Sequence, residues 1–469
     1  MRLALALTGF IGAASLSSTA RALDAEVEAL TLGQFYGLRS IADEALDQTR
    51  FSQSLRVNLF NIAPENKLYF VSHLRLDANA ALTDAETAQI GAITEYQRAT
   101  VSLLVGYLAG RNLWKRVDFG LGRQLSIDAL DYFVYDGLRL AVNTPWYFGV
   151  EALAGFQVRG TSALGFSAFQ PWGTHEADDT GAAPVFGVAV YARDVHFGGF
   201  RTEGRAAWRR VFNGAIVEER VGAHVEQMLA HLVTVNLGAT YNLVFDGFDE
   251  VTAGARVRLF DRRLQVAAEY FRATPRFDAD SIWNVFSTYA SDDVRAKVTF
   301  EISESLEVFA RALVRFFSNR VFPTDAVQDA MVSDRGGAIG ARYLSRTTGR
   351  LALECGGEAS FQAGWGGDRI ATDAYAIVSA WQRRILVQSR FTFVNLADDI
   401  GPRRTGNYVG FVLGATYRIL RGTSLGVLTE TLVNDTRNLF RFYVALESSL
   451  TFWDDPVDMN RARAVGTTP

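Results

Sequence analysis

The five histidines are the first residues to consider for chemistry, because imidazole can serve as a metal ligand or as a general base. They are His73, His175, His196, His224 and His231, and no two of them have the HxH, HxxxH or HExxH spacing of a metal site. No phosphate-binding glycine loop occurs, although a triad assembled from distant residues stays open. We therefore expect no enzyme activity and no cofactor.

A short acidic segment, residues 175–179, is a candidate for divalent cation binding, because carboxylates and imidazole are metal ligands. Runs of this kind are more often solvated loops, and this one lies between two segments with strand patterns. We therefore predict no metal site.

A second kind of chemistry, electrostatic attraction of solutes, is indicated by charges at alternate positions of short amphipathic segments. The acidic residues at these positions are Glu203, Glu218, Glu226, Glu269, Glu301, Glu307 and Glu447. The basic residues outnumber them by eight, and they are Arg56, Arg75, Arg139, Arg205, Arg209, Arg220, Arg256, Arg258, Arg295, Lys297, Arg311, Arg315, Arg390, Arg418 and Arg441. An enclosed basic surface would concentrate anions. The alternative is that the arginines and glutamates pair and brace a wall.

The segments that carry these charges have a period of two. Between residues 233 and 243 the odd-numbered positions from Val233 to Leu243 are apolar, and the even-numbered positions from Thr234 to Asn242 are small or polar. Residues 251–259, 294–302 and 409–419 repeat the pattern. Such alternation predicts strands with one apolar and one solvated face.

The number and pattern of these predicted strands indicate one closed antiparallel β-barrel that crosses a membrane. We place about 22 of them between residues 28 and 453, within a range of roughly 16 to 22. No linker or composition shift divides this region into the several domains that a soluble protein with so many strands would need. A sheet that spans a membrane must also close, because hydrocarbon satisfies no open edge.

The connections between the predicted strands alternate between long and short. The long ones include 79–93, 159–183, 274–292 and 318–334, whereas the short ones include Thr144-Pro145 and Leu420-Arg421. Outer-membrane barrels have long external loops and short periplasmic turns, so both ends of the barrel are predicted to lie in the periplasm. The loops 159–183, 274–292 and 318–334 are the candidates for narrowing the lumen.

The two ends divide the chain into three parts. Residues 1–22 resemble a secretory signal peptide, with Arg2 followed by an apolar stretch too short to cross a membrane. Residues 23–453 form the predicted barrel, and 454–469 form a polar periplasmic tail. The last strand ends in Phe452-Trp453 and resembles the aromatic strand that the barrel-assembly machinery recognises. So few residues flank the barrel that we expect no plug domain.

Composition restricts the other classes of protein. No apolar window long enough for a transmembrane helix follows the predicted signal. The net charge of −4 argues against a nucleic-acid partner, and the single Cys355 excludes an intramolecular disulfide. The 9 prolines and 41 glycines suit a large sheet. Outer-membrane lipids are the expected surroundings.

One short segment resembles a known family. Gly122-Arg123-Gln124, followed by Asp136-Gly137-Leu138-Arg139, is similar to the "GRQ … DGLR" segment of alginate-export-type and related large porins. The resemblance implies a passive outer-membrane conduit for an anionic polysaccharide, with Arg123 and Arg139 facing the pore. It also implies separate periplasmic export proteins as partners.

These observations predict a porin-like channel in the cell outer membrane, for passive passage of anionic solutes or for export of an acidic polysaccharide. The alternative is a structural barrel that anchors an envelope-spanning machine. The predicted pore-lining residues are Arg123, Arg139, Arg205, Arg209, Arg256, Arg258, Arg295, Lys297, Arg311, Arg315, Arg390 and Arg418.

Overall fold

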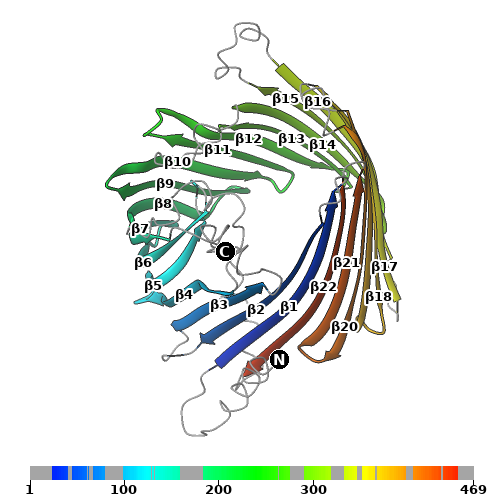
Figure 1. Ribbon diagram of the computed structural model, residues 1–469. Helices are drawn as coiled ribbons and strands as arrows, with labels where there is room; N and C mark the ends of the chain where they lie inside the picture. Colours follow the sequence, from blue (N-terminus) through cyan, green and yellow to red (C-terminus); the bar gives the residue numbers. More distant parts are fainter. Residues whose placement is uncertain are drawn as a thin grey trace.

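A computed structural model describes residues 24–40, 45–60, 62, 67–79, 99–127, 129–130, 132–158, 183–261, 263–274, 290–317, 332–345, 351–364, 367–397, 405–434 and 437–452. The described residues form 22 strands in a single sheet (Figure 1). The strands are β1 (Asp24–Ser40), β2 (Ala45–Phe60), β3 (Leu68–Asn79), β4 (Ala99–Leu113), β5 (Val117–Ile127), β6 (Tyr132–Asn143), β7 (Phe148–Gln157), β8 (Ala183–Phe197), β9 (Phe200–Asn213), β10 (Ala215–Leu229), β11 (Val233–Asn242), β12 (Gly247–Leu259), β13 (Leu264–Ala273), β14 (Ser291–Ser303), β15 (Leu306–Phe317), β16 (Val332–Leu344), β17 (Leu351–Gly364), β18 (Asp368–Ala380), β19 (Ile385–Ala397), β20 (Gly406–Leu420), β21 (Thr423–Asn434) and β22 (Arg437–Phe452).

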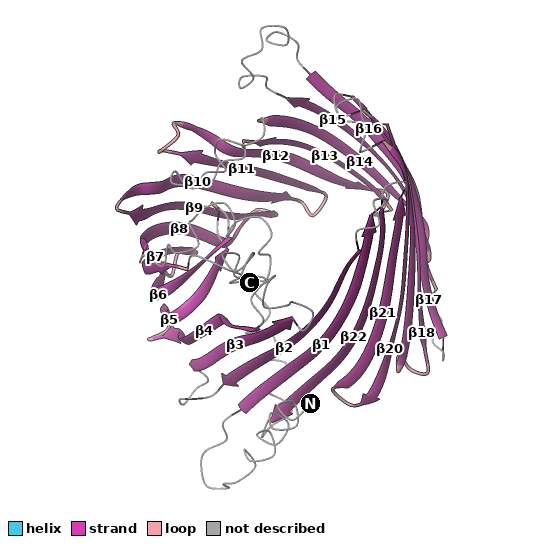
Figure 2. Cartoon of the chain, viewed as in Figure 1, coloured by secondary structure: helices cyan, strands magenta, loops and turns pink. Residues whose placement is uncertain are grey.

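The sheet closes on itself. Every strand pairs antiparallel with its neighbour in the sequence, and β1 pairs with β22 from Ala25–Phe452 to Ser40–Arg437. The described residues contain no helix and form no second domain beside the barrel (Figure 2). The predicted fold, an antiparallel barrel of 22 strands without a plug domain, is confirmed.

The outer face of the wall is apolar. In β7 the exposed Val150 and Ala152 alternate with the buried Glu151 and Leu153, and in β20 the exposed positions include Phe411. A closed wall with apolar side chains outward is the architecture of a transmembrane barrel of the outer membrane, because every backbone group is paired and lipid covers the outside. No helix long and apolar enough to cross a membrane occurs among the described residues.

The connections distinguish the two ends of the barrel. The longest ones, residues 80–98, 158–182, 274–290 and 318–331, all follow odd-numbered strands, as predicted. At the opposite end, three tryptophans stand in short turns, with Trp114 82% exposed and Trp146 and Trp381 also exposed. Exposed aromatics at a strand end are typical of the membrane interface. We call these two ends the long-loop end and the short-turn end.

Several predicted segments lie outside the described residues. They are the signal peptide (1–22), the polar tail (454–469), Trp453, the acidic segment 175–179 and nearly all of the three loops predicted to narrow the lumen. They stay predictions.

Two facing glycines allow β6 and β7 to approach closely. Gly137 and Gly155 are opposite each other, and a Cβ on Gly155 would lie 2.3 Å from the carbonyl oxygen of Asp136 and 2.7 Å from the Cα of Gly137. Neither contact involves a flexible side chain, so the backbone itself would have to move.

We therefore expect Gly155→Ala to destabilise the barrel by about 1–3 kcal/mol, the usual cost of overpacking. The temperature at which the folded barrel loses its fast migration in detergent gel electrophoresis measures this effect. Gly33→Ala is the matched control, because a Cβ on Gly33 meets nothing closer than 3.9 Å. Equal transition temperatures for the two variants would contradict the prediction.

Candidate functional site: the lumenal wall

The register of the strands decides which face each predicted residue occupies. Lys297 pairs with Ala267 and Arg311, and Arg311 pairs with Ala338, so these residues share the concave face. The same reasoning across the wall assigns the concave, lumenal face to all the predicted residues except Arg123. They are Arg139, Arg205, Arg209, Arg256, Arg258, Arg295, Lys297, Arg311, Arg315, Arg390 and Arg418.

Arg123 occupies the opposite face, so the prediction that it lines the pore is wrong. Arg139 lies across from Gly120, which makes the even-numbered positions of β5 lumenal. Arg123 shares the outer face with Leu121, which is 54% exposed. Its guanidinium donates two hydrogen bonds to Asp136, at 2.8 and 2.7 Å, and one to the carbonyl oxygen of Leu103 at 2.9 Å. The hydrogen-bonding capacity of this guanidinium is therefore used within the wall.

The lumenal wall holds many more carboxylates than the sequence analysis assigned to it. They include Glu28, Asp77, Glu151, Asp293, Asp334, Glu354, Glu358, Asp373 and Glu430. They offset the predicted excess of eight positive charges, which is therefore wrong for the wall as a whole. Most of them form ion pairs with arginines of the same or neighbouring strands. The alternative of a braced wall thus describes much of this surface.

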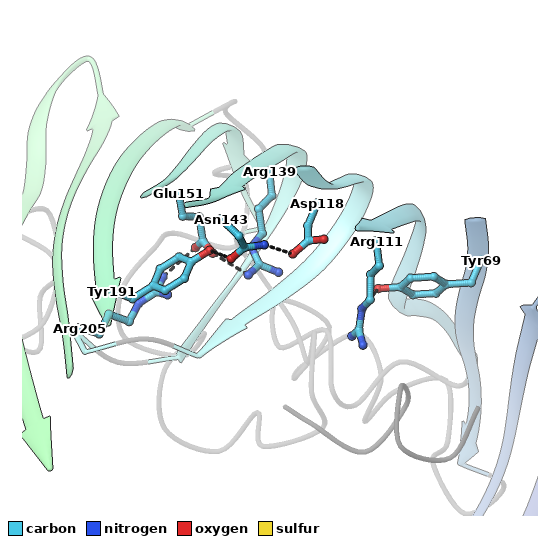
Figure 3. A network of polar contacts seen from close by, with 8 residues as sticks. All are labelled: Tyr69, Arg111, Asp118, Arg139, Asn143, Glu151, Tyr191 and Arg205. Carbon is cyan, nitrogen blue, oxygen red and sulfur yellow. Dashed lines mark hydrogen bonds and ion pairs between the residues drawn. The ribbon is translucent and has the colours of Figure 1, made fainter. Parts of the chain in front are cut away.

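The strongest brace lies in β5 to β9 (Figure 3). Glu151, only 2% exposed, accepts hydrogen bonds from Arg139 at 2.5 Å and from Arg205 at 2.7 Å. Beside them, the hydroxyl of Tyr191 donates to Asn143 at 2.7 Å, and Asn143 donates to Asp118 at 3.1 Å (Figure 3). One buried carboxylate therefore holds two arginines from different strands.

A second brace is both apolar and charged. Arg209 and Glu218 are buried together with 2.7 Å between guanidinium and carboxylate, and the guanidinium of Arg209 lies over the ring of Phe133 at 4.2 Å. Around them is a buried cluster formed by Phe133, Tyr135, Leu153, Ala183, Val185, Val211 and Val217. Apolar side chains on both faces of β6 to β10 make this part of the wall thick.

The connection between β5 and β6 reaches into the lumen. Leu130 is buried against Ala189 and Ala207 of β8 and β9, and the hydroxyl of Thr240 in β11 donates to the carbonyl oxygen of Ala129 at 3.1 Å. Gly222 of β10 leaves room for it, because a Cβ there would lie 2.8 Å from Leu130 Cδ2. This connection was not among those predicted to enter the lumen, and its short length carried no signal.

A groove opens in the other half of the wall, along β13 to β19. Its volume is about 620 Å³, and its floor is made of small residues that include Ala267, Gly336, Ala338 and Ala371. Its charged residues are Glu269, Arg295, Lys297, Arg311, Glu358, Arg369, Asp373 and Arg390. Cations therefore outnumber carboxylates here, by five to three. We call this feature the lumenal groove.

Three of the five cations of the groove have carboxylate partners. Arg311 pairs with Glu358, Arg390 pairs with Asp373 at 2.7 Å, and Arg295 pairs with Asp293 just outside the groove at 2.7 Å.

Two cations of the groove are not compensated in this way. Lys297 lies over the ring of Phe309, at 5.2 Å, and Arg369 is exposed, and neither has an ion pair among the described residues. Of the three carboxylates in the groove, Glu269 also has no ion pair in the described part of the chain. Lys297 was predicted from the sequence, whereas Arg369 was not, although the register gives it the same lumenal face.

The comparisons with known proteins give structural neighbours alone. The sequence matches no known protein family and no curated protein sequence. The barrel is similar to Pseudomonas aeruginosa OpdK, solved with vanillate (10% identity, 91% of this chain, 99% of that chain, TM-score 0.40), and to Acinetobacter baumannii OccAB2 (11%, 92%, 98%, 0.41). It is also similar to P. aeruginosa OccK7 (OpdD) (11%, 92%, 100%, 0.42).

Glu151 is predicted to stabilise the folded barrel. We expect Glu151→Gln to lower the stability of the barrel by about 3 kcal/mol, because two lumenal arginines lose a buried partner. The temperature at which the folded barrel loses its fast migration in detergent gel electrophoresis measures this loss of stability. Glu447→Gln is the control, since Glu447 accepts a single long hydrogen bond within the described part of the chain, from Ser424 at 3.4 Å. Indistinguishable melting of the two variants would argue against the brace.

The second prediction concerns the connection that carries Leu130. In a Cys355→Ser background, Ala129→Cys places the thiol beside Leu130 and keeps the buried leucine side chain, so we expect it to react slowly with a water-soluble maleimide. Adding Gly222→Ala pushes a methyl group against Leu130 Cδ2, so the reaction should become at least about tenfold faster, equivalent to about 1.4 kcal/mol of destabilised docking. Gly204→Ala, where the nearest atom is 3.4 Å away, is the control. An unchanged rate would show that Gly222 does not hold the connection.

Proposed function

We propose that the protein is an outer-membrane channel through which small anionic solutes pass passively along the lumenal groove. The proposal rests on one observation, the two uncompensated cations Lys297 and Arg369 over a floor of small side chains. Cations already paired with carboxylates attract little, whereas unpaired cations in a concave wall raise the local concentration of anions. Arg256, Arg258 and Arg418 are further lumenal cations without ion pairs among the described residues.

The openness and the charge pairing of the groove favour passive passage of solutes over tight binding. It is an open hollow in the wall, and its paired cations, such as Arg311 and Arg390, already have partners with which an anion must compete. A solute that meets only a few uncompensated charges can enter and also leave, which conduction requires.

Export of an acidic polysaccharide is not part of the proposal. The expectation came from the short segment that ends at Arg139, and both of its candidate arginines have other roles here. Arg123 faces outward, and Arg139 is held by Glu151.

A structural barrel is the second candidate function, and a specific observation favours it. The sector from β6 to β10 is packed and ion-paired on its lumenal side, and the connection at Leu130 lies on it. A protein that anchors other envelope components needs rigidity and no conduction.

Planar-bilayer recording under a salt gradient tests the channel. We expect a conductance selective for anions. In a water-like dielectric, a unit charge about 8 Å from the path favours an anion by about 0.5 kcal/mol and disfavours a cation by about as much, roughly a sixfold preference. Lys297→Gln combined with Arg369→Gln should therefore lower the anion-to-cation permeability ratio roughly thirtyfold at low salt, where screening is weak.

Lys115→Gln, a change at an exposed short-turn residue, is the matched control and should leave the ratio unaltered. Cation selectivity of the unaltered barrel would refute the preference for anions. A complete absence of conductance would favour the structural alternative.

A further inference from the structure

The outer face of the barrel carries a few charged residues within its apolar surface. By register, Arg123, Arg210, Arg272 and Arg335 all point away from the lumen. A charge on the lipid-facing side of a barrel costs about 2–4 kcal/mol at the membrane midplane and close to nothing at the interface. The position and the partners of each arginine therefore indicate what surrounds it.

Three of these arginines lie close to the long-loop end of their strands. Arg210 is near the end of β9, Arg272 is next to the last residue of β13, and Arg335 is the fourth residue of β16. The short-turn end instead carries exposed aromatic side chains, among them Trp114 and Phe260. The arginines thus lie at the headgroup level of the leaflet on the long-loop side.

The arginines differ in how well the protein itself satisfies them. Arg123 is fully engaged by Asp136 and Leu103, and Arg210 pairs with Glu219. Arg272 lies 3.4 Å from Asp292 and also contacts the hydroxyl of Tyr270, which itself donates a hydrogen bond to Asp292 at 2.6 Å.

Arg335 is the least satisfied of the four. It is exposed, and it makes no hydrogen bond or ion pair with the described residues. Its neighbours on the outer face are apolar. Val314 and Ala363 lie across from it, and Ile339, 68% exposed, lies four residues further along the same face of β16.

Arg272 and Arg335 belong to one patch. Arg272 pairs with Asp292, Asp292 with Phe316, and Phe316 with Ser333, which shares the outer face with Arg335 two residues later. Three strand spacings separate β13 from β16, or about 14 Å. Exposed Val314, Ile339 and Phe361 extend from the patch toward the middle of the wall.

We propose that this outer patch on β13 to β17 binds the phosphorylated headgroup of a lipid in the leaflet on the long-loop side. Arg335 and Arg272 donate to phosphate oxygens, a geometry that guanidinium groups favour, and the acyl chains lie along Val314, Ile339 and Phe361. Arg272 offsets the charge of Asp292, to which Tyr270 also donates a hydrogen bond, so Arg335 supplies the net positive charge of the patch. Such a site is independent of conduction through the lumen.

Native mass spectrometry of the purified full barrel in detergent tests the proposal, with diphosphorylated lipid A as the probe. We expect retention of bound lipid at stoichiometric amounts, and at least a fivefold weaker retention by Arg335→Gln and by Arg272→Gln. Arg263→Gln is the matched control, because Arg263 is exposed in the short turn that precedes β13, and this variant should bind lipid as the unaltered barrel does.

A second arm uses only the unaltered barrel, so it does not depend on whether the variants fold. Lipid A stripped of its phosphates should be retained at least fivefold more weakly than the diphosphorylated form. Equal retention of the two lipids would show that only acyl chains are recognised and would overturn the proposal. Competition by equimolar inorganic phosphate would overturn the assignment to a lipid.

Discussion

The hydrogen-bonded ladder between neighbouring strands is the interaction on which the rest of this structure depends. Because side chains alternate with a period of two, each ladder pairing assigns every residue to the lipid or to the lumen. The pairing of Lys297 with Ala267 and Arg311 brings the groove residues to one face, and the pairing of Gly120 with Arg139 places Arg123 on the outer face. Charges, aromatics and small residues acquire their roles only through this register.

Alternation along the chain was enough to predict the number of strands, their order and the two kinds of connection. It could not predict every face, because a bulge changes the parity between neighbouring strands. Such shifts occur between His73 and Leu74 and between Gly110 and Leu113, just before the strand that carries Arg123. A residue assigned from a short motif is therefore easily given the wrong face.

Pairing between distant side chains was also beyond the sequence. Glu151 lies in an alternating segment like many others, and nothing in its neighbourhood indicates that it holds both Arg139 and Arg205. Leu130 illustrates the same limit for connections, since its burial depends on Gly222 and Ala207, far away in the chain. The wall consequently has two different parts. One is packed and ion-paired, and the other contains a groove with an excess of cations. The total charge of the wall does not reveal this difference.

The seam between β1 and β22 has a consequence for how the chain reaches its folded state. Ala25 pairs with Phe452, so β1, which already pairs with β2, meets its second ladder partner only when nearly the whole polypeptide has been made. Such a long-range pairing is slow to form, since a very long loop must close before any contact stabilises it. Until then the free edges of the growing sheet leave unpaired backbone groups to which another chain can bind. The transit of this protein to the membrane is therefore its period of greatest exposure to aggregation.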